Sequence, residues 1–191
     1  MRINKNIPNI LSAYRLFAFP FLIYSITSKH PVLFAWLICI NLITDVLDGM
    51  IARRFKLQTE LGARLDSAAD VTTYISAVWG IYVFKWAEIE PFNTLFLVFV
   101  SLYALSMLIG IIKFKQLPSL HLYSFKVMGY LQGFFIFYLF TFGFLKWLFF
   151  LALGWGIWAC IEEILVLLVL PKMRSNAKGL YWVLNKHTTN G

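Results

Sequence analysis

The sequence contains long runs of apolar residues, each long enough to cross a lipid bilayer as a helix. A spanning helix needs about 20 mostly apolar residues, because the hydrocarbon core is about 30 Å thick. Backbone polar groups in lipid must be satisfied internally, which favours helices. We therefore predict an all-α, polytopic membrane protein, a bundle of six transmembrane helices forming a single domain over residues 1–191. The runs lie at about residues 10–28, 31–52, 66–86, 91–112, 122–144 and 147–171.

The composition excludes a water-soluble globular protein. Of the 191 residues, 60% are hydrophobic and only 14% are charged, whereas soluble domains have roughly 45–50% apolar and about 25% charged residues. The net charge of +8 would suit a nucleic-acid partner in a soluble protein. In a membrane protein, the orientation of the chain explains an excess of basic residues. We therefore expect no nucleic-acid partner.

Basic residues are unevenly divided between the two sides of the predicted bundle. If both termini lie on the same side, that side carries fourteen of the 17 lysine and arginine residues. The other side has only Lys29, Lys85 and Lys146. Because loops rich in Lys and Arg stay in the cytosol, we predict that both termini and the loops 53–65 and 113–121 are cytosolic. The expected location is a bacterial-type plasma membrane.

Four of the nine acidic residues lie near the cytosolic ends of the second and third runs. Asp45 and Asp48 are three residues apart, and Asp66 and Asp70 are four apart, so each pair projects from one face of its helix. Carboxylates in apolar helices cost roughly 2.5–3.5 kcal/mol each on insertion scales and mark a functional site. The short loop between these helices lets the two pairs face each other. Four anions so close together require cations.

Two sources of positive charge fit this cluster. Divalent metal ions are favoured, because an all-oxygen ligand set suits Mg²⁺ or Mn²⁺ and two such ions form a clamp for phosphoryl chemistry. The alternative is neutralisation by basic side chains of the same stretch, although side chains just past a helix end normally extend toward water. These basic residues are Arg53, Arg54, Lys56 and Arg64.

The four aspartates belong to a longer pattern of fixed spacing. It reads Asp45-Val-Leu-Asp48-Gly49-Met-Ile-Ala52-Arg53, then eight residues, then Gly62-Ala-Arg-Leu-Asp66-Ser-Ala-Ala-Asp70. The pattern resembles the signature of the CDP-alcohol phosphatidyltransferases, D-x2-D-G-x2-A-R-x8-G-x3-D-x3-D, and matches it at every fixed position. The segment from Asn6 to Arg15 is similar to the opening of phosphatidylglycerophosphate synthases, and members of the family commonly have six transmembrane helices.

The resemblance implies transfer of a phosphatidyl group from CDP-diacylglycerol to an alcohol, with release of CMP. It also implies that two Mg²⁺ or Mn²⁺ ions are held by the carboxylates of Asp45, Asp48, Asp66 and Asp70. Asp70, the last residue of the signature, is similar to the general base of the family, which takes the proton of the acceptor hydroxyl. The expected partners are CDP-diacylglycerol, a polar alcohol and membrane lipids.

Small and polar residues of the signature are the candidates for binding CDP-diacylglycerol. Gly49 and Ala52 leave room for cytidine beside the helix, although small residues also serve helix packing in membranes. Arg53 can bind the nucleotide phosphates with its planar guanidinium. Thr59 stands where related enzymes carry a small hydroxyl residue. Gly62 is expected to permit the turn into the third helix and to line the cytidine pocket.

A phosphorylated acceptor requires positive charges of its own. Lys126, at the start of the fifth run, is the main candidate, followed by Lys113 and Arg15, because such side chains pair with phosphate. For Lys113, a role in membrane orientation or at the lipid surface is favoured over phosphate binding. Glycerol 3-phosphate is the favoured acceptor. Inositol phosphate, serine or another alcohol stay open, since Ser67 and Val71 stand where related glycerophosphate enzymes often have Pro and Lys.

A small cation transporter or channel is the rival from another functional class, because it would also place acids inside the membrane. Its ion site is expected near the midplane, whereas these aspartates lie toward one surface. A non-catalytic scaffold is disfavoured, since all four aspartates are present. Glu162 and Glu163, inside the last run, are expected to contact a partner on a neighbouring helix, such as Lys or Tyr, or a second copy of the chain. A homodimer is left open.

Overall fold

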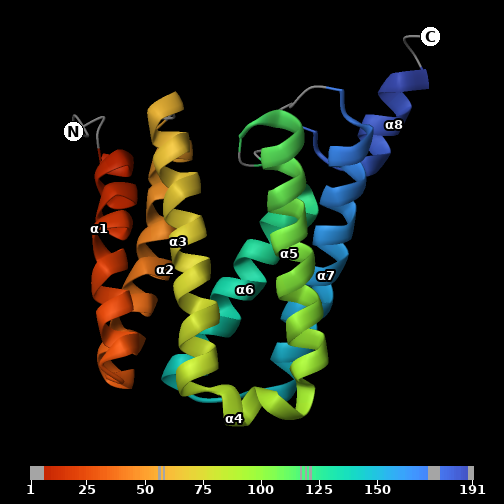
Figure 1. The fold of residues 1–191 in the computed structure, drawn as a ribbon. Helices are drawn as coiled ribbons and strands as arrows, with labels where there is room; N and C mark the ends of the chain where they lie inside the picture. The colour runs from red at the N-terminus through yellow and green to blue at the C-terminus, as the bar shows by residue number, and fades with distance from the viewer. Residues whose placement is uncertain are drawn as a thin grey trace. The chain divides into compact units, whose positions relative to one another are not determined.

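The computed structural model describes residues 7–55, 57, 59–116, 118, 120, 122–171 and 177–188, and this part of the chain is helical, without strands (Figure 1). Lys56 lies outside the described residues, as do the side chains of Arg53 and Arg64. The elements are α1 (Ile7–Thr27), α2 (Pro31–Arg54), α3 (Glu60–Phe84), α4 (Trp86–Ile89), the short 3-10 helix η1 (Glu90–Phe92), α5 (Asn93–Phe114), α6 (Tyr123–Thr141), α7 (Lys146–Val169) and α8 (Leu180–Thr188).

The apolar runs of the sequence coincide with long helices, and the protein is an all-helical membrane protein. Each of the six runs overlaps one of the helices α1, α2, α3, α5, α6 and α7. Within the described residues, four segments are long and apolar enough to cross a membrane. They are Ile7–Thr27, Pro31–Ala52, Trp86–Phe114 and Lys146–Val169. For α3 and α6, a transmembrane position stays a prediction, and so does the count of six spans.

The helices form two compact units, each with its own packing. The first unit comprises Met1–Glu88 with Leu139–Gly143, and the second comprises Ile89–Tyr138 with Phe144–Gly191. The first therefore contains α1, α2 and α3, and the second contains α5, most of α6, α7 and α8. That the chain works as a single domain stays a prediction.

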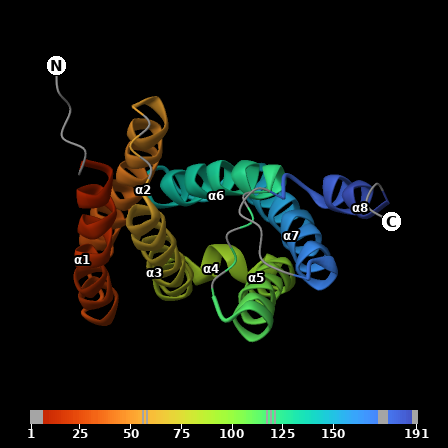
Figure 2. The ribbon, with the colours of Figure 1, turned by 90° about the horizontal axis from the view of Figure 1, so that it is seen from above.

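In the first unit, α1 packs against both α2 and α3, and the three helices lie beside one another in both views (Figures 1 and 2). A short connection between Thr27 and Pro31 makes α1 and α2 antiparallel neighbours. Gly80 of α3 lies directly against the ring of Phe34 of α2, so a Cβ at this position would overlap the ring. The core of this unit is apolar and includes Ala18, Leu22, Ile26, Phe34, Ile38, Ala69, Ala77 and Ile81.

The start of α1, the end of α2 and the start of α3 lie at the same end of the first unit (Figure 1). The chain leaves α2 at Arg54 and enters α3 at Glu60. Thr59 is the N-cap of α3, and its hydroxyl accepts a hydrogen bond from the Gly62 N–H at 3.0 Å. Such a cap satisfies one of the free N–H groups at a helix start.

In the second unit, α7 packs against both α5 and α8. Polar contacts join α6 to α7. The Gln132 side-chain amide donates to the Ala152 carbonyl at 2.9 Å, and the Trp155 indole N–H donates to the Ser124 carbonyl at 3.0 Å. Hydrogen bonds of this kind hold membrane helices together where the lipid offers no hydrophobic driving force.

Glu162 of α7 links three segments of the second unit. Its carboxylate accepts hydrogen bonds from the Ser124 hydroxyl of α6 and from the N–H of Leu180, the first residue of α8, the latter at 3.0 Å. The expected partner on a neighbouring helix is thus confirmed for Glu162, and it is a serine, whereas Lys and Tyr were named as examples. Glu163, the next residue, is buried in the same unit.

Candidate active site

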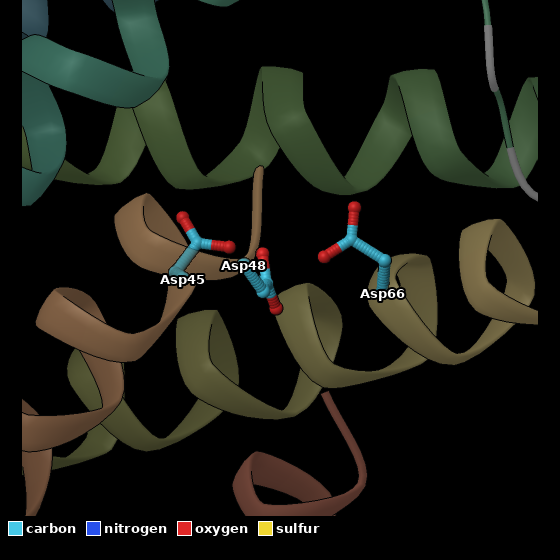
Figure 3. Close-up of side chains that lie close together, drawn as sticks. All are labelled: Asp45, Asp48 and Asp66. Atoms are coloured by element: carbon cyan, nitrogen blue, oxygen red, sulfur yellow. The ribbon is translucent and has the colours of Figure 1, made fainter. Parts of the chain in front are cut away.

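The candidate active site is a cluster of four carboxylates around one guanidinium in the first unit. Asp45 and Asp48 come from α2, Asp66 and Asp70 from α3, and Arg15 from α1. Figure 3 shows three of these aspartates, Asp45, Asp48 and Asp66, gathered between α2 and α3. The structure thus brings together the two pairs that the spacing of the sequence placed on facing helices.

Arg15 is hydrogen-bonded to every carboxylate of the cluster. Its Nη1 donates to Asp45 Oδ1 at 2.6 Å and to Asp70 Oδ1 at 2.8 Å. Its Nη2 donates to Asp66 Oδ1 at 2.6 Å and to Asp48 Oδ2 at 2.9 Å. Charge-assisted bonds between guanidinium and carboxylate are among the stronger hydrogen bonds in proteins. The repulsion among four neighbouring anions is therefore reduced by a cation from the first helix.

One side of the cluster is buried in the protein, and the other side is partly exposed. The Arg15 side chain is 1% exposed and that of Asp48 is 5% exposed, whereas Asp45, Asp66 and Asp70 are 44–46% exposed. Ser12, one turn before Arg15 on α1, donates to Asp48 Oδ2 at 3.0 Å. The α1 side of the site is thus filled by protein, and the three more exposed carboxylates offer the surface that a ligand can reach.

Arg15 occupies a position in the site that the sequence did not predict. Arg15 was grouped with Lys113 and Lys126 as a ligand for the acceptor phosphate, yet its buried guanidinium is held by the aspartates. Divalent metal ions were favoured to neutralise the cluster, with basic residues near the signature as the alternative, whereas among the described side chains Arg15 contacts the carboxylates and Arg54 is exposed. The physical reason is tertiary: the packing of α1 against α2 and α3 brings Arg15 to the carboxylates.

The two lysines proposed for the acceptor belong to the second unit. Lys113 donates from Nζ to the carbonyls of Leu167 and Leu168 at 2.8 Å, near the end of α7, where cations are favoured by the helix dipole. The Lys126 ammonium lies over the ring of Tyr123, 5.3 Å from its centroid. The Lys113 ammonium is therefore bonded to the backbone of α7, and the Lys126 ammonium lies against an aromatic ring.

The small residues of the signature lie at the same end of the first unit as the carboxylates. Gly49 and Ala52 lie in the last turns of α2. Gly62 lies in the first turn of α3, and a Cβ there would meet the Asn9 side chain of α1 and come within 2.9 Å of Thr59 Oγ1. Gly62 therefore permits the close approach of α1 to α3, and its predicted place at the cytidine stays a prediction.

Thr59→Ala is expected to lower the free energy of unfolding by about 1 kcal/mol, because the N-cap of α3 is lost. Thr59→Ser keeps the hydroxyl that accepts from Gly62 and serves as the matched control. Chemical unfolding of both variants in mixed detergent micelles measures the difference. Equal stability of the two variants would show that the cap contributes nothing measurable.

The carboxylates fit a divalent cation. Asp45, Asp48 and Asp66 each offer one oxygen, and these oxygens lie within 4.8 Å of one another. Hard oxygen ligands of this kind suit Mg²⁺ and Mn²⁺ rather than zinc or copper. With Asp70 at the same guanidinium, the site combines candidate metal ligands with a partly exposed carboxylate that can accept a proton.

Comparison with known proteins agrees with this geometry. The sequence model of the CDP-alcohol phosphatidyltransferase family matches residues 5–169. The chain is 41% identical over 68 residues to the CDP-diacylglycerol–glycerol-3-phosphate 3-phosphatidyltransferase of Salmonella choleraesuis (34% of this chain, 37% of that protein). It is 40% identical over 73 residues to the protein of the same name from Rickettsia bellii (37% and 40%), and 37% identical over 68 residues to that of Escherichia coli (34% and 37%).

These alignments are partial. The chain spans between 37% and 40% of the length of these curated relatives. No solved structure shows a significant match. The family match, in contrast, extends over the whole of α1 to α7.

Proposed function

This chain belongs to the CDP-alcohol phosphatidyltransferase family, and we propose that it transfers the phosphatidyl group of CDP-diacylglycerol to glycerol 3-phosphate, with release of CMP. The observation that carries the proposal is the convergence of the four signature aspartates at one end of α2 and α3, with Arg15 between them. The names of the relatives support glycerol 3-phosphate as the acceptor. Inositol phosphate, serine and other alcohols are the alternatives that the assay below separates.

Asp45, Asp48 and Asp66, with Asp70 shared, are proposed to hold two Mg²⁺ or Mn²⁺ ions. When bound, such ions neutralise the diphosphate of the donor and stabilise the departing CMP. Asp48, buried and hydrogen-bonded to Ser12 and Arg15, is the most firmly fixed of these ligands. The others are exposed on the open side, where the substrates arrive.

Asp70 is proposed as the general base. In the reaction, the acceptor oxygen forms a bond to the phosphorus of the phosphatidyl group, and the bond from that phosphorus to the oxygen of CMP breaks. The proton of the acceptor hydroxyl moves to the Asp70 carboxylate, and CMP leaves with the bonding electron pair. Oδ1 of Asp70 accepts from Arg15 at 2.8 Å, so its other oxygen is the one proposed to receive the proton.

Gly49, Ala52, Arg53, Thr59 and Gly62 are proposed to surround the nucleotide of CDP-diacylglycerol. Their support is the family signature together with their position beside the carboxylates. For the acceptor phosphate we propose Lys126 as the main ligand, with Lys113 secondary because its ammonium is already bonded to two carbonyls of α7.

We further propose six membrane spans, both termini in the cytosol, and a site that faces the cytosol at the plasma membrane. Asp45 lies nine residues before the end of α2, which at about 1.5 Å per residue is roughly 14 Å from that end. This depth suits a reaction between a lipid headgroup and a water-soluble acceptor. The match of one family model to residues 5–169 supports one domain. The position of all four aspartates toward one end of their helices argues against an ion-transport path.

Purified protein in detergent tests the proposal. With CDP-diacylglycerol, Mg²⁺ and glycerol 3-phosphate, we expect release of CMP in proportion to the phosphatidyl product formed. Inositol phosphate and serine, offered in place of glycerol 3-phosphate, are expected to give only background rates. Asp45→Asn protein is the inactive control. The reaction class is wrong if no acceptor gives CMP, and the acceptor is wrong if serine or inositol phosphate is preferred.

A further inference from the structure

We propose that Arg15 stays bonded to the four aspartates when the metal ions are present, and that it is a positioning residue for the metal site. In this arrangement the guanidinium fixes the carboxylates from the α1 side, and the metal ions bind the remaining carboxylate oxygens from the open side. The inference rests on the proposed function. It assigns to Arg15 a role toward the metals instead of a role toward the acceptor phosphate.

The first observation is how the guanidinium divides its bonds. Nη1 joins Asp45 of α2 to Asp70 of α3, and Nη2 joins Asp48 of α2 to Asp66 of α3. Each terminal nitrogen therefore ties one helix to the other. Because the guanidinium is planar and rigid, it fixes the spacing of the two carboxylate pairs. A lysine ammonium is a single point charge and lacks the two terminal nitrogens of the guanidinium.

The second observation is which oxygens are used. Arg15 bonds Oδ1 of Asp45, Asp66 and Asp70 and Oδ2 of Asp48, which is one oxygen from each carboxylate. A carboxylate has two oxygens and about four acceptor sites. The second oxygens of Asp45, Asp48 and Asp66 are not used by Arg15 and can bind a metal ion. The second oxygen of Asp70 is the proposed proton acceptor, so a shared metal contact of Asp70 uses the remaining lone pair of Oδ1. The guanidinium and the ions thus require different acceptor sites of the same side chains.

The third observation is burial. Arg15 is 1% exposed, while Asp45, Asp66 and Asp70 are 44–46% exposed, so ions reach the carboxylates without crossing the guanidinium. Arg15 is the ninth residue of α1, about 12 Å along this apolar helix. A guanidinium displaced from the carboxylates at that depth would leave a charge without an ionic partner inside the membrane, which is strongly unfavourable.

The formal charge of the site favours the same arrangement. Four carboxylates and Arg15 together carry three negative charges, and two divalent ions change this to one positive charge. Without Arg15 the loaded site would be neutral. Since the donor presents a diphosphate anion, a site with a net positive charge binds it better.

The test compares Mn²⁺ binding by three proteins, followed by electron paramagnetic resonance and calorimetry. The substitution Arg15→Lys keeps the positive charge but removes the planar guanidinium. We expect the Mn²⁺ dissociation constant to rise about tenfold, which is typical for the loss of a residue that orients metal ligands. The matched control Arg54→Lys carries the same change at an exposed arginine of α2 and is expected to bind as the wild type does. If Arg15 is instead a cation that the metal displaces, Arg15→Lys binds Mn²⁺ equally well or more tightly, which overturns the inference.

A second measurement does not depend on the folding of a variant. In a structure of the wild-type protein loaded with Mn²⁺, we expect Nη1 and Nη2 of Arg15 to remain within hydrogen-bond distance of the four aspartates. Metal density at the position of the guanidinium, with Arg15 turned away, overturns the inference and leaves the proposed function intact. A wild-type protein that binds no Mn²⁺ contradicts the proposed metal site itself.

Discussion

Asp70→Asn is expected to lower kcat by about 10³-fold, because a positioned general base contributes roughly 10²–10⁴-fold to such reactions and the amide cannot accept the proton. The substitution keeps the size of the side chain and an oxygen for the bond from Arg15 Nη1. The measurement is CMP release at saturating Mn²⁺ and saturating substrates. The metal must be saturating because Asp70 is also proposed as a shared metal ligand. Excess Mn²⁺ restores occupancy of the metal site when one ligand is weakened, but it cannot replace the missing general base.

Glu88→Gln provides the matched control for this carboxylate-to-amide change. Glu88 follows α3 and is paired with Lys85 at 2.9 Å, and no part of the proposed mechanism uses it. We expect it to retain the wild-type rate. If the Asp70→Asn rate returns to that of the wild type when Mn²⁺ is raised, Asp70 is a metal ligand only, and the proton must be accepted elsewhere.

The helices follow from the sequence because the thickness of the bilayer sets their length. Every predicted run overlaps a long helix. The largest difference is at the start of α3, which begins at Glu60 rather than at residue 66. Marking apolar runs misses the start of this helix, where Glu60, Arg64 and Asp66 interrupt the apolar residues, and Thr59 begins the helix there through its cap. A threonine followed directly by a glutamate was the available signal.

The aspartate pairs follow from local spacing, but Arg15 does not. Residues three and four apart share a helix face, and the short loop sets α2 against α3, so the sequence was enough to place four carboxylates together. The bonds from Arg15 to Asp45 and Asp70 join residues 30 and 55 positions apart. The basic side chains considered as an alternative to metal ions were those near the signature in the chain, and Arg15 was not among them. A charged residue in the middle of an apolar span needs a buried partner, and this rule was the signal for Arg15.

Removal of metal is expected to abolish turnover. Without a divalent ion, the four carboxylates are balanced only by Arg15 among the described side chains. The cluster then carries a net negative charge, which disfavours binding of the donor diphosphate. We expect EDTA to reduce CMP release to background and either Mg²⁺ or Mn²⁺ to restore it. Turnover that persists after exhaustive chelation would exclude the proposed metal site.

Asp66→Asn locates this metal dependence in the cluster. Asp66 accepts a hydrogen bond from Arg15 at 2.6 Å and is 46% exposed, so its substitution disturbs the packing less than that of the buried Asp48. Because one of three oxygens within 4.8 Å of one another is changed, we expect the Mn²⁺ dissociation constant to rise by about 100-fold, the upper end of the range for disturbed metal sites. The apparent Mg²⁺ requirement for CMP release should rise in parallel. Glu88→Gln again serves as the control, since it removes a carboxylate without touching the cluster. Unchanged Mn²⁺ affinity in Asp66→Asn would mean that the ions bind outside the four aspartates, and the geometry around Arg15 would then be purely structural.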